Sequence, residues 1–228
     1  MSKRCVVVIG ASSGIGLATA RAFRDAGDSV HAAARRDISE PGIAGHTLDF
    51  TDHHAVANFA APFERVDALI ISAGTNIKQR RLHELTPDSW DHVVAANLNG
   101  PFYLLHAFHD ALRAAQGTFI VISSVSGAWT DRSGPAYQAA KAGAIALTRG
   151  VGFEVDGAIR TTAILPGVVD TPILDNRPEP PDAETRAQML MAEDIAAACK
   201  FVVDLPPRAF VPELTILPTA LQAIGKTM

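Results

Sequence analysis

A tyrosine and a lysine stand four positions apart at the start of a helical pattern, as Tyr137 and Lys141. Residues at positions i and i+4 share one face of a helix, so both polar groups can point at one site. A phenol transfers protons slowly near neutral pH because its pKa is about 10, and a nearby ammonium favours the phenolate. The pair therefore indicates proton transfer, although a tyrosine packed on a lysine stem is the simpler interpretation when the pair stands alone.

A serine hydroxyl is expected to join the pair. Ser124 lies 13 residues before Tyr137 and directly follows the apolar run Phe119–Ser123, which has the composition of a buried strand. Open α/β sheets bind their ligands beyond the carboxyl ends of their strands, so this hydroxyl is predicted to lie at the ligand-binding edge. Hydroxyl, phenol and ammonium in one pocket would hydrogen-bond a carbonyl oxygen and give it a proton.

Short apolar runs alternate with helical patterns, and most of these runs are continuous, as in parallel sheets covered by helices on both faces. The expected strands are Cys5–Ile9, Ser29–Ala34, His46–Asp49, Ala68–Ser72, Thr118–Ser123, Thr161–Leu165 and Leu214–Leu217. The expected helices are Ile15–Ala26, Ala55–Phe63, Ser89–Leu112, Ala136–Phe153 and Ala192–Val203. Right-handed crossovers between them predict a single doubly wound α/β domain over residues 1–228, a Rossmann-type fold with a parallel seven-stranded sheet.

Composition narrows the class of protein. The chain has 228 residues, of which 48% are hydrophobic and 19% charged, as is typical of one globular domain. A formal charge of −4 gives no electrostatic footprint for nucleic acid, and no apolar run reaches the roughly 18 residues of a membrane span. Two cysteines, Cys5 and Cys199, cannot build a disulfide framework, and the eight histidines show no metal-ligand spacing. We therefore expect a cytoplasmic protein with a small-molecule partner and no nucleic acid, membrane or metal partner.

One segment departs from the alternating pattern. Residues 175–184 contain three prolines, which excludes a regular helix or a central strand there. The segment follows the carboxyl end of a predicted strand, where such sheets bind ligands. We interpret it as a lid over the substrate, around residues 173–187, and a solvated surface loop is the alternative.

A glycine-rich turn, Gly10–Gly16, joins the first predicted strand to the first predicted helix. Glycine permits a positive φ and a close backbone approach, and the N-terminus of the following helix attracts the phosphates of a nucleotide. The succession of strand, turn and helix favours a dinucleotide site over a turn that binds nothing. The predicted phosphate contacts are Gly10, Ser12, Ser13, Gly14, Ile15 and Gly16.

Several motifs follow one another in an order that resembles the short-chain dehydrogenase/reductase family over nearly the whole chain. They are Gly-x3-Gly-x-Gly from Gly10, Asn-x2-Gly from Asn97, the serine segment Ile122–Gly127, Tyr-x3-Lys from Tyr137 and Pro-Gly-x3-Thr from Pro166. The resemblance implies an oxidoreductase that moves a hydride between a nicotinamide and a carbonyl or secondary alcohol. It also implies four catalytic residues, namely Asn97, Ser124, Tyr137 and Lys141.

In family terms, each catalytic residue has its own role. Tyr137 is the general acid or base, Ser124 hydrogen-bonds the substrate oxygen, and Lys141 also binds the nicotinamide ribose. Asn97 interrupts the hydrogen bonding of its helix and holds a water in contact with the lysine. A core amide with its hydrogen bonds made inside the protein is the alternative for this asparagine.

The resemblance also implies contacts to the rest of the cofactor. Asp49 and Phe50 correspond to the adenine pocket, and Thr171 with the main chain of Val169 corresponds to the nicotinamide carboxamide site. The other residues implied are Ser72, Ala73, Gly74, Asn97, Tyr137, Lys141, Pro166 and Gly167. Ser72 departs from the asparagine that the family usually has at this position.

The end of the second predicted strand bears on the choice between NADP and NAD. An NAD site places a carboxylate there to bind the ribose hydroxyls, but the position that the resemblance indicates is Ala34. Arg35 and Arg36 follow, and a guanidinium can bind a 2′-phosphate through its planar fork. NADP(H) is therefore predicted. NAD is the alternative, and it would be favoured if the strand extended to Asp37.

Two other functions are compatible with the same scaffold. One is a dinucleotide-sensing regulator without catalysis, which would be expected to lose the tyrosine or the lysine. The other is an epimerase or dehydratase, which net redox turnover with NADPH would distinguish from a dehydrogenase. By resemblance, a homodimer or homotetramer is expected through helices 102–112 and 141–150. Loops 76–81, 126–130 and 173–187 are expected to line the substrate pocket, and no motif in them names a substrate.

Overall fold

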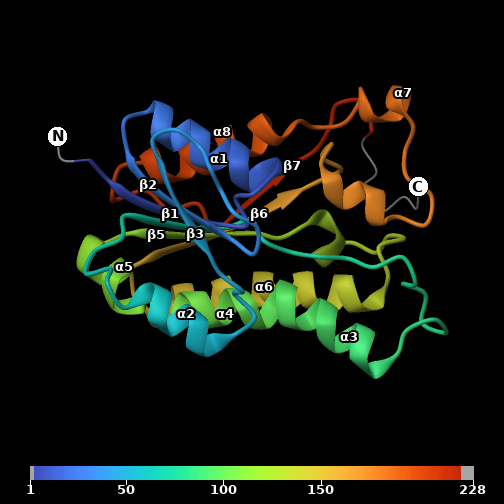
Figure 1. The fold of residues 1–228 in the computed structure, drawn as a ribbon, viewed down its shortest axis with the longest axis horizontal. Helices are drawn as coiled ribbons and strands as arrows, with labels where there is room; N and C mark the ends of the chain where they lie inside the picture. The colour runs from blue at the N-terminus through green and yellow to red at the C-terminus, as the bar shows by residue number, and fades with distance from the viewer. Residues whose placement is uncertain (1–2, 222–228) are drawn as a thin grey trace.

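The chain forms a seven-stranded parallel sheet with helices on both faces (Figure 1). The computed structural model describes residues 3–221, and residues 1–2 and 222–228 of the predicted 1–228 domain lie outside the described residues. The strands are β1 (Cys5–Ile9), β2 (Ser29–Ala34), β3 (Ile43–Thr47), β4 (Ala68–Ile71), β5 (Thr118–Ile122), β6 (Arg160–Pro166) and β7 (Glu213–Ile216). Their order across the sheet is β3-β2-β1-β4-β5-β6-β7, which confirms the predicted doubly wound Rossmann-type fold.

The helices form two layers around this sheet (Figure 1). On one face lie α1 (Gly14–Asp25) and α8 (Ala192–Asp204). On the other lie α2 (His53–Ala60), α3 (Pro87–Val94), α4 (Gly100–Ala107), α5 (His109–Ala115) and α6 (Pro135–Glu154). Within residues 3–221, none of the helices has the length and apolar character needed to cross a membrane.

The continuous apolar runs arise because each central strand contributes to two cores. In β1, Val6 and Val8 pack into the core beneath α1 and α8, whereas Val7 and Ile9 pack into the core on the opposite face. All four side chains are buried. Burying one such side chain stabilises the fold by about 1.5–3 kcal/mol. A strand with no exposed face therefore shows no polar and apolar alternation.

The third strand differs from the predicted His46–Asp49. β3 begins earlier, at the edge of the sheet, and pairs with Val30–Ala34 of β2. Its sequence, Ile-Ala-Gly-His-Thr, contains small residues that bury little surface, so its strand signal is weak. Asp49 consequently lies beyond the strand and not at its end.

The single helix predicted over residues 89–112 is divided. A π-helical turn spans Ala95–Asn99, between α3 and α4. The buried side chain of Asn97 donates through Nδ2 to the carbonyls of Val93 and Thr75, both at 2.8 Å. This amide competes with the main chain for the Val93 carbonyl, and the helix widens locally. The same bonds tie the helix to the loop that follows β4.

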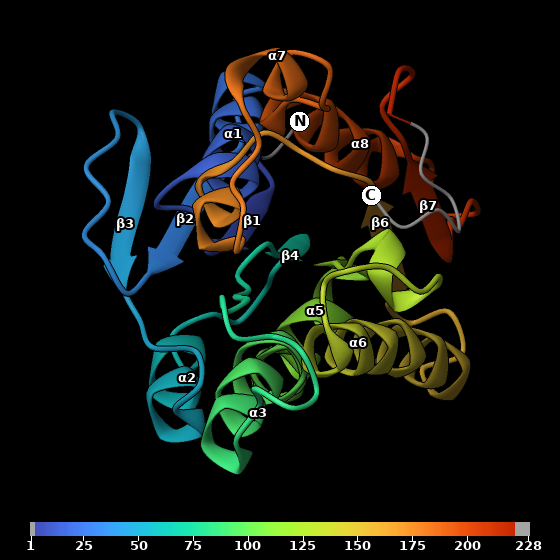
Figure 2. The same ribbon diagram turned by 90° about the vertical axis from the view of Figure 1, so that its right-hand side faces the viewer.

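The segment predicted as a lid contains two short helical turns around an irregular stretch. A 3₁₀ turn spans Pro172–Asn176, and α7 covers Ala183–Arg186, which enters the range in which no helix was predicted. The proline-rich residues between the two turns stay irregular. Arg186 forms ion pairs with Asp170 and Asp175, at 2.8 and 2.6 Å, and so ties the end of the segment to its beginning. Figure 1 and Figure 2 place α7 on the same side of the sheet as α1 and α8.

The order of the strands reverses between β1 and β4. β2 and β3 lie to one side of this point, and β5, β6 and β7 lie to the other. The connections that leave the two neighbouring strands therefore run to opposite faces of the sheet and leave a crevice at its carboxyl edge.

Candidate active site

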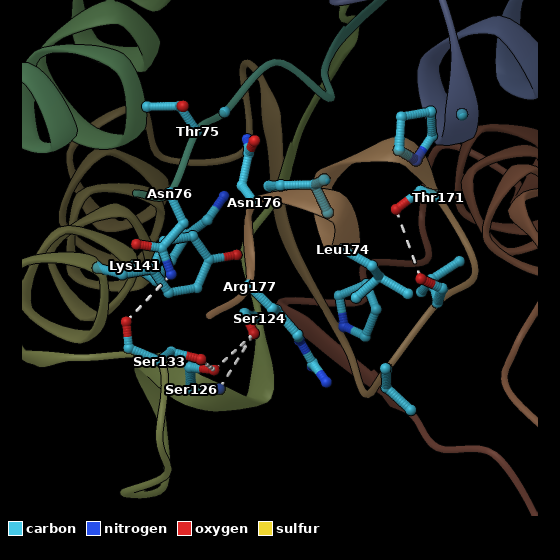
Figure 3. A pocket seen from close by; sticks show the side chains of 18 of the residues that line it. Thr75, Asn76, Ser124, Ser126, Ser133, Lys141, Thr171, Leu174, Asn176 and Arg177 are labelled. Atoms are coloured by element: carbon cyan, nitrogen blue, oxygen red, sulfur yellow. Dashed lines mark hydrogen bonds between the residues drawn. The ribbon is translucent and has the colours of Figure 1, made fainter. Parts of the chain in front are cut away.

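A cavity of about 1280 Å³ opens at this carboxyl edge (Figure 3). Sites for drug-sized ligands have volumes of about 300–1,000 Å³, so the cavity has room for a dinucleotide and a small substrate together. The predicted residues that line it are Gly10, Ser12, Ser13, Gly14, Ile15, Arg35, Arg36, Phe50, Ser72, Ala73, Gly74, Ser124, Tyr137, Lys141, Pro166, Gly167, Val169 and Thr171.

The glycine-rich turn passes close to the loop that follows β4. Gly10 has a φ of +85°, and a Cβ atom at this position would lie 2.5 Å from the main-chain nitrogen of Ala73. A larger residue would therefore force the two loops apart. α1 begins directly after the turn without an acidic residue in its first turn, so its N–H groups and positive dipole end lie at the cavity. The turn thus fits the pyrophosphate of a dinucleotide.

Three predicted residues, Gly16, Asp49 and Asn97, are not among the described residues that line the cavity. Gly16 packs under the turn, where a Cβ atom would lie 2.4 Å from a carbonyl oxygen of the same turn. Asp49 accepts hydrogen bonds from the hydroxyl and the N–H of Thr51, which hold the pKa of its carboxyl below the usual value. Asn97 is bonded to the main chain of Thr75. The contacts predicted between these three residues and the cofactor stay predictions.

Two arginines follow β2, and their surroundings differ. β2 ends at Ala34, as predicted. One amino group of Arg36 donates to the hydroxyls of Ser12 and Ser13, both at 3.0 Å. Sequence reasoning named Arg35 first as the phosphate ligand, but the guanidinium that is held beside the phosphate-binding turn is that of Arg36.

Lys141 is directed into the protein. It lies on α6, is 5% exposed, and its Nζ donates to the carbonyl of Ile122 at 2.9 Å. The ammonium lies 5.6 Å from the centre of the Tyr137 ring. Burial lowers the pKa of Lys141 to about 8, because a charge is costly to remove from water. The lysine can thus gain or release a proton near neutral pH.

Tyr137 is a weak acid in this pocket. Burial raises its pKa to about 12, while the hydroxyl of Ser124 and the charges of Arg177 and Arg80 act in the opposite direction. Sequence reasoning named Lys141 and the oxidised nicotinamide ring as the charges that lower this pKa. The ammonium of Lys141 donates to a strand carbonyl and lies 5.6 Å from the centre of the ring, and two further cations that act on the phenol come from loops.

A chain of hydrogen-bonded side chains holds Ser124 in place (Figure 3). The hydroxyl of Ser124 donates to that of Ser126 at 3.1 Å and accepts from the N–H of the same residue, also at 3.1 Å. Ser126 in turn donates to the carboxylate of Asp131 at 2.5 Å, and the N–H of Ser133 donates to this carboxylate at 2.8 Å. Sequence reasoning missed Asp131 and Ser133, whose only signal was a run of small polar residues after the predicted strand.

Two arginines at the substrate end of the cavity were also missed. Arg80, in the loop after β4, is 7% exposed, and it donates to the carbonyls of Ile77 at 2.8 Å and Asn176 at 2.6 Å. Arg177 follows Asn176 and lines the same cavity (Figure 3). Both arginines lie in loops that were expected to line the pocket. An arginine in a loop gives no sequence signal that its side chain turns inward.

Comparison with known proteins finds relatives along most of the chain. The family model described as short chain dehydrogenase matches residues 4–182. The cis-4-hydroxycyclohexanecarboxylate dehydrogenase of Sinomonas cyclohexanicum is 34% identical over 212 residues, which are 85% of this chain and 83% of that protein. The 2-dehydro-3-deoxy-L-rhamnonate dehydrogenase (NAD(+)) of Sphingomonas sp. (strain SKA58) is 32% identical and covers 77% of this chain and 76% of its own length.

A solved structure is similar over nearly the full length of the chain. An alcohol dehydrogenase from the archaeon Thermococcus sibiricus, complexed with 5-hydroxy-NADP, has a TM-score of 0.84 and 28% sequence identity, and the match covers 97% of this chain and 99% of that one. The family match includes the glycine-rich turn, Ser124, Tyr137 and Lys141. The chain therefore belongs to the short chain dehydrogenase family and is an NAD(P)-dependent oxidoreductase that acts on alcohol or carbonyl groups.

Proposed function

We propose that this protein transfers a hydride between NADP(H) and a carbonyl or secondary alcohol, with Tyr137 as the general acid or base. The observation that carries the proposal is that the side chains of Ser124, Tyr137 and Lys141 line one cavity together with the glycine-rich turn. A dinucleotide-sensing protein has no need of a hydroxyl, a phenol and an ammonium at one place.

Each side chain has its own task in the reduction of a carbonyl. The N–H of Ser126 holds the oxygen of Ser124, and the Ser124 O–H can rotate toward the substrate oxygen and donate to it. Tyr137 gives its proton to that oxygen as the alcohol forms and takes a proton back in the reverse reaction. When bound, the nicotinamide supplies or accepts the hydride.

Lys141 is the next proton carrier in this scheme. Its pKa of about 8 lies close to neutral pH, so it can pass a proton onward after the phenol has lost one. A bond from Lys141 to the nicotinamide ribose and a water held by Asn97 remain predictions from the family resemblance. The bonds seen for Asn97 run to the main chain of Thr75, at 2.8 and 3.3 Å, and to that of Val93, at 2.8 Å, which supports a positioning role for this residue.

The preference for NADP(H) over NAD(H) is supported by the end of β2. No carboxylate occupies the last position of the strand, which is Ala34, and the guanidinium of Arg36 is held beside the turn. Both cofactors occur in the names of similar proteins: the Thermococcus sibiricus structure is described with 5-hydroxy-NADP, and the Sphingomonas enzyme is named for NAD(+). The choice for this chain therefore depends on its own residues.

Arg36→Ala is expected to lower the ratio of kcat/KM with NADPH to kcat/KM with NADH by roughly 10- to 100-fold, because charge-assisted hydrogen bonds to a phosphate contribute about 1.5–3 kcal/mol. The measurement is the initial rate of NADPH and NADH oxidation with one carbonyl substrate. Arg35→Ala is the matched control, and its ratio is expected to change less. A ratio that is the same in wild type and Arg36→Ala would exclude Arg36 as the phosphate ligand.

We also infer that the chain is one domain and that residues 173–187 act as a lid. The segment supplies Ile173, Leu174 and Arg177 to the wall of the cavity, and its end is tied back to its beginning by Arg186. A homodimer or homotetramer stays a prediction. The exposure of Phe102, at 48%, is in keeping with contacts through helix 102–112.

A further inference from the structure

Two arginines that line the cavity, Arg80 and Arg177, form no ion pair with a described residue, although the charge of Asp131 acts on both of them. Among residues 3–221, no carboxylate lies within ion-pair distance of Arg80 or Arg177. Two acids of the neighbouring segment, Asp170 and Asp175, are already bound to Arg186. A buried cation normally has a paired anion, so this arrangement indicates that the partner is a ligand.

The two guanidinium groups differ in the N–H donors that are available for a ligand. Arg80 uses Nε and one amino group on main-chain carbonyls, so its remaining amino group is the one available for other partners. Arg177 is partly buried, and its side chain makes no hydrogen bond to any described residue of the protein. Burial and then the charge of Arg177 lower the pKa of Arg80, and burial lowers the pKa of Arg177. Arg177 is therefore the principal donor, and Arg80 is a second charge that also holds the Asn176 carbonyl.

The charges near the phenol indicate what kind of ligand would fit. Arg80, Arg177 and Asp131 act on Tyr137, and the ammonium of Lys141 lies 5.6 Å from the centre of its ring. The carboxylate of Asp131 already accepts from Ser126 and Ser133. Positive charges therefore outnumber negative ones around the phenol, which favours an anionic ligand.

We propose that Arg177, assisted by Arg80, binds a carboxylate of the substrate, so that the substrate is an oxo acid or the corresponding hydroxy acid. The inference rests on the proposed function, because it places the reacting carbonyl at Ser124 and Tyr137 and the carboxylate at the arginines. Both arginines line the same cavity as Ser124 and Tyr137, so one small molecule can carry both the acid group and the reacting oxygen. A guanidinium presents two parallel N–H groups that match a carboxylate, which also orients the substrate.

The test compares acids with esters that have the same carbonyl. NADPH oxidation is measured with acetoacetate and 4-oxopentanoate, each beside its methyl ester, in wild type, Arg177→Gln and Arg132→Gln. Arg132 is the matched control because it is an exposed arginine that lines the same cavity. The wild type is expected to favour the acids by roughly 10- to 100-fold in kcat/KM, and Arg177→Gln is expected to bring the ratio near one. Arg132→Gln is expected to keep the wild-type ratio.

Three results would overturn the proposal. The first is a wild type that reduces the esters as well as the acids. The second is an Arg177→Gln variant that loses activity on acids and esters by the same factor, since this would indicate a role in lid structure alone. The third is a preference for dihydroxyacetone phosphate over both oxo acids.

A binding measurement separates this inference from the proposed function. Calorimetric titration of 4-oxopentanoate and its methyl ester into the protein with NADP⁺ present requires no turnover. Tighter binding of the acid that Arg177→Gln removes would support the carboxylate site even if no compound were reduced, and that pattern would count against the proposed reaction. Equal binding of acid and ester would overturn the carboxylate site and leave the reaction untouched.

Discussion

Tyr137→Phe is expected to lower kcat/KM by roughly 10²- to 10⁴-fold, the range that a positioned general acid or base contributes. The ring remains in place on α6, so packing against Lys141 is kept, and only the proton that moves to the substrate oxygen is lost. Affinity for NADPH is expected to change by less than about threefold. The free energy that corresponds to a threefold change in affinity is well below the energy of one charge-assisted hydrogen bond. The measurement is steady-state NADPH oxidation together with cofactor titration by fluorescence.

The sequence contains only two tyrosines, and the second one provides a matched control. Tyr103 lies on α4 and does not line the cavity, so Tyr103→Phe removes the same hydroxyl elsewhere. Its kcat/KM is expected to stay close to that of the wild type. Turnover by Tyr137→Phe at the wild-type rate would remove the proton-transfer role, even if the variant bound cofactor normally.

Lys141→Met is expected to have two effects of opposite sign. Activity should fall by roughly 10²- to 10⁴-fold, because the proton carrier next to the phenol is gone. Stability at pH 7 should rise. The shift of the Lys141 pKa from 10.5 to about 8 corresponds to roughly 3 kcal/mol of destabilisation of the folded state, and loss of the bond to Ile122 offsets about 1 kcal/mol of the gain. Methionine fills a similar volume without a charge.

The pH dependence of this gain has a definite sign. Below about pH 8 the lysine is protonated in both folded and unfolded chains, so the cost of the buried charge is fully present. Between about pH 8 and 10.5 the folded wild type releases the proton while the unfolded chain keeps it, and wild-type stability recovers. The advantage of Lys141→Met should therefore be largest near neutral pH and absent at the upper end of this range. Tyr137 is present in both proteins, so its own titration cancels in the difference.

Urea unfolding of the two proteins across this pH range, without added cofactor, measures the difference. Lys200→Met is the control, because Lys200 forms an i, i+4 pair with Asp204 on the surface of α8, and such pairs contribute little to stability. An unfolding free energy of Lys141→Met that lay below the wild-type value at pH 7 would show that the ammonium is well solvated or paired in the folded protein. The pKa assigned to Lys141 would then be wrong.

Sequence patterns predicted those parts of the fold that are determined mainly by residues close together in the sequence. The buried residues of β1 face two cores, so their apolar run is unbroken, and β2 ends at Ala34 as expected. β3 was misplaced because its pairing with β2 is a long-range contact and its small residues carry little signal. The three residues proposed for catalysis could be found because serine, tyrosine and lysine stand at set distances from a strand end and along a helix.

Side-chain direction was beyond the reach of the sequence. Asp49 turns to Thr51, and Arg80 turns inward to the Asn176 carbonyl, which lies 96 positions further along the chain. Each of these directions depends on which partner the folded backbone brings near. The partner of Arg80 is not marked by composition or spacing, whereas that of Asp49 lies only two residues away. The choice between Arg35 and Arg36 could not be made from the sequence for the same reason, because the side chains of neighbouring residues beyond a strand end have no fixed direction.

The contact between Arg36 and the two serine hydroxyls bears on how the protein discriminates between nucleotides. A surface arginine that is immobilised by a ligand ordinarily loses about 0.5–1.5 kcal/mol of rotational freedom. In this protein the guanidinium is already held by Ser12 and Ser13, so part of that entropy is lost during folding. A phosphorylated ribose would bind to a guanidinium that is already in position. The selectivity for this ribose would then be a property of the protein before the nucleotide binds.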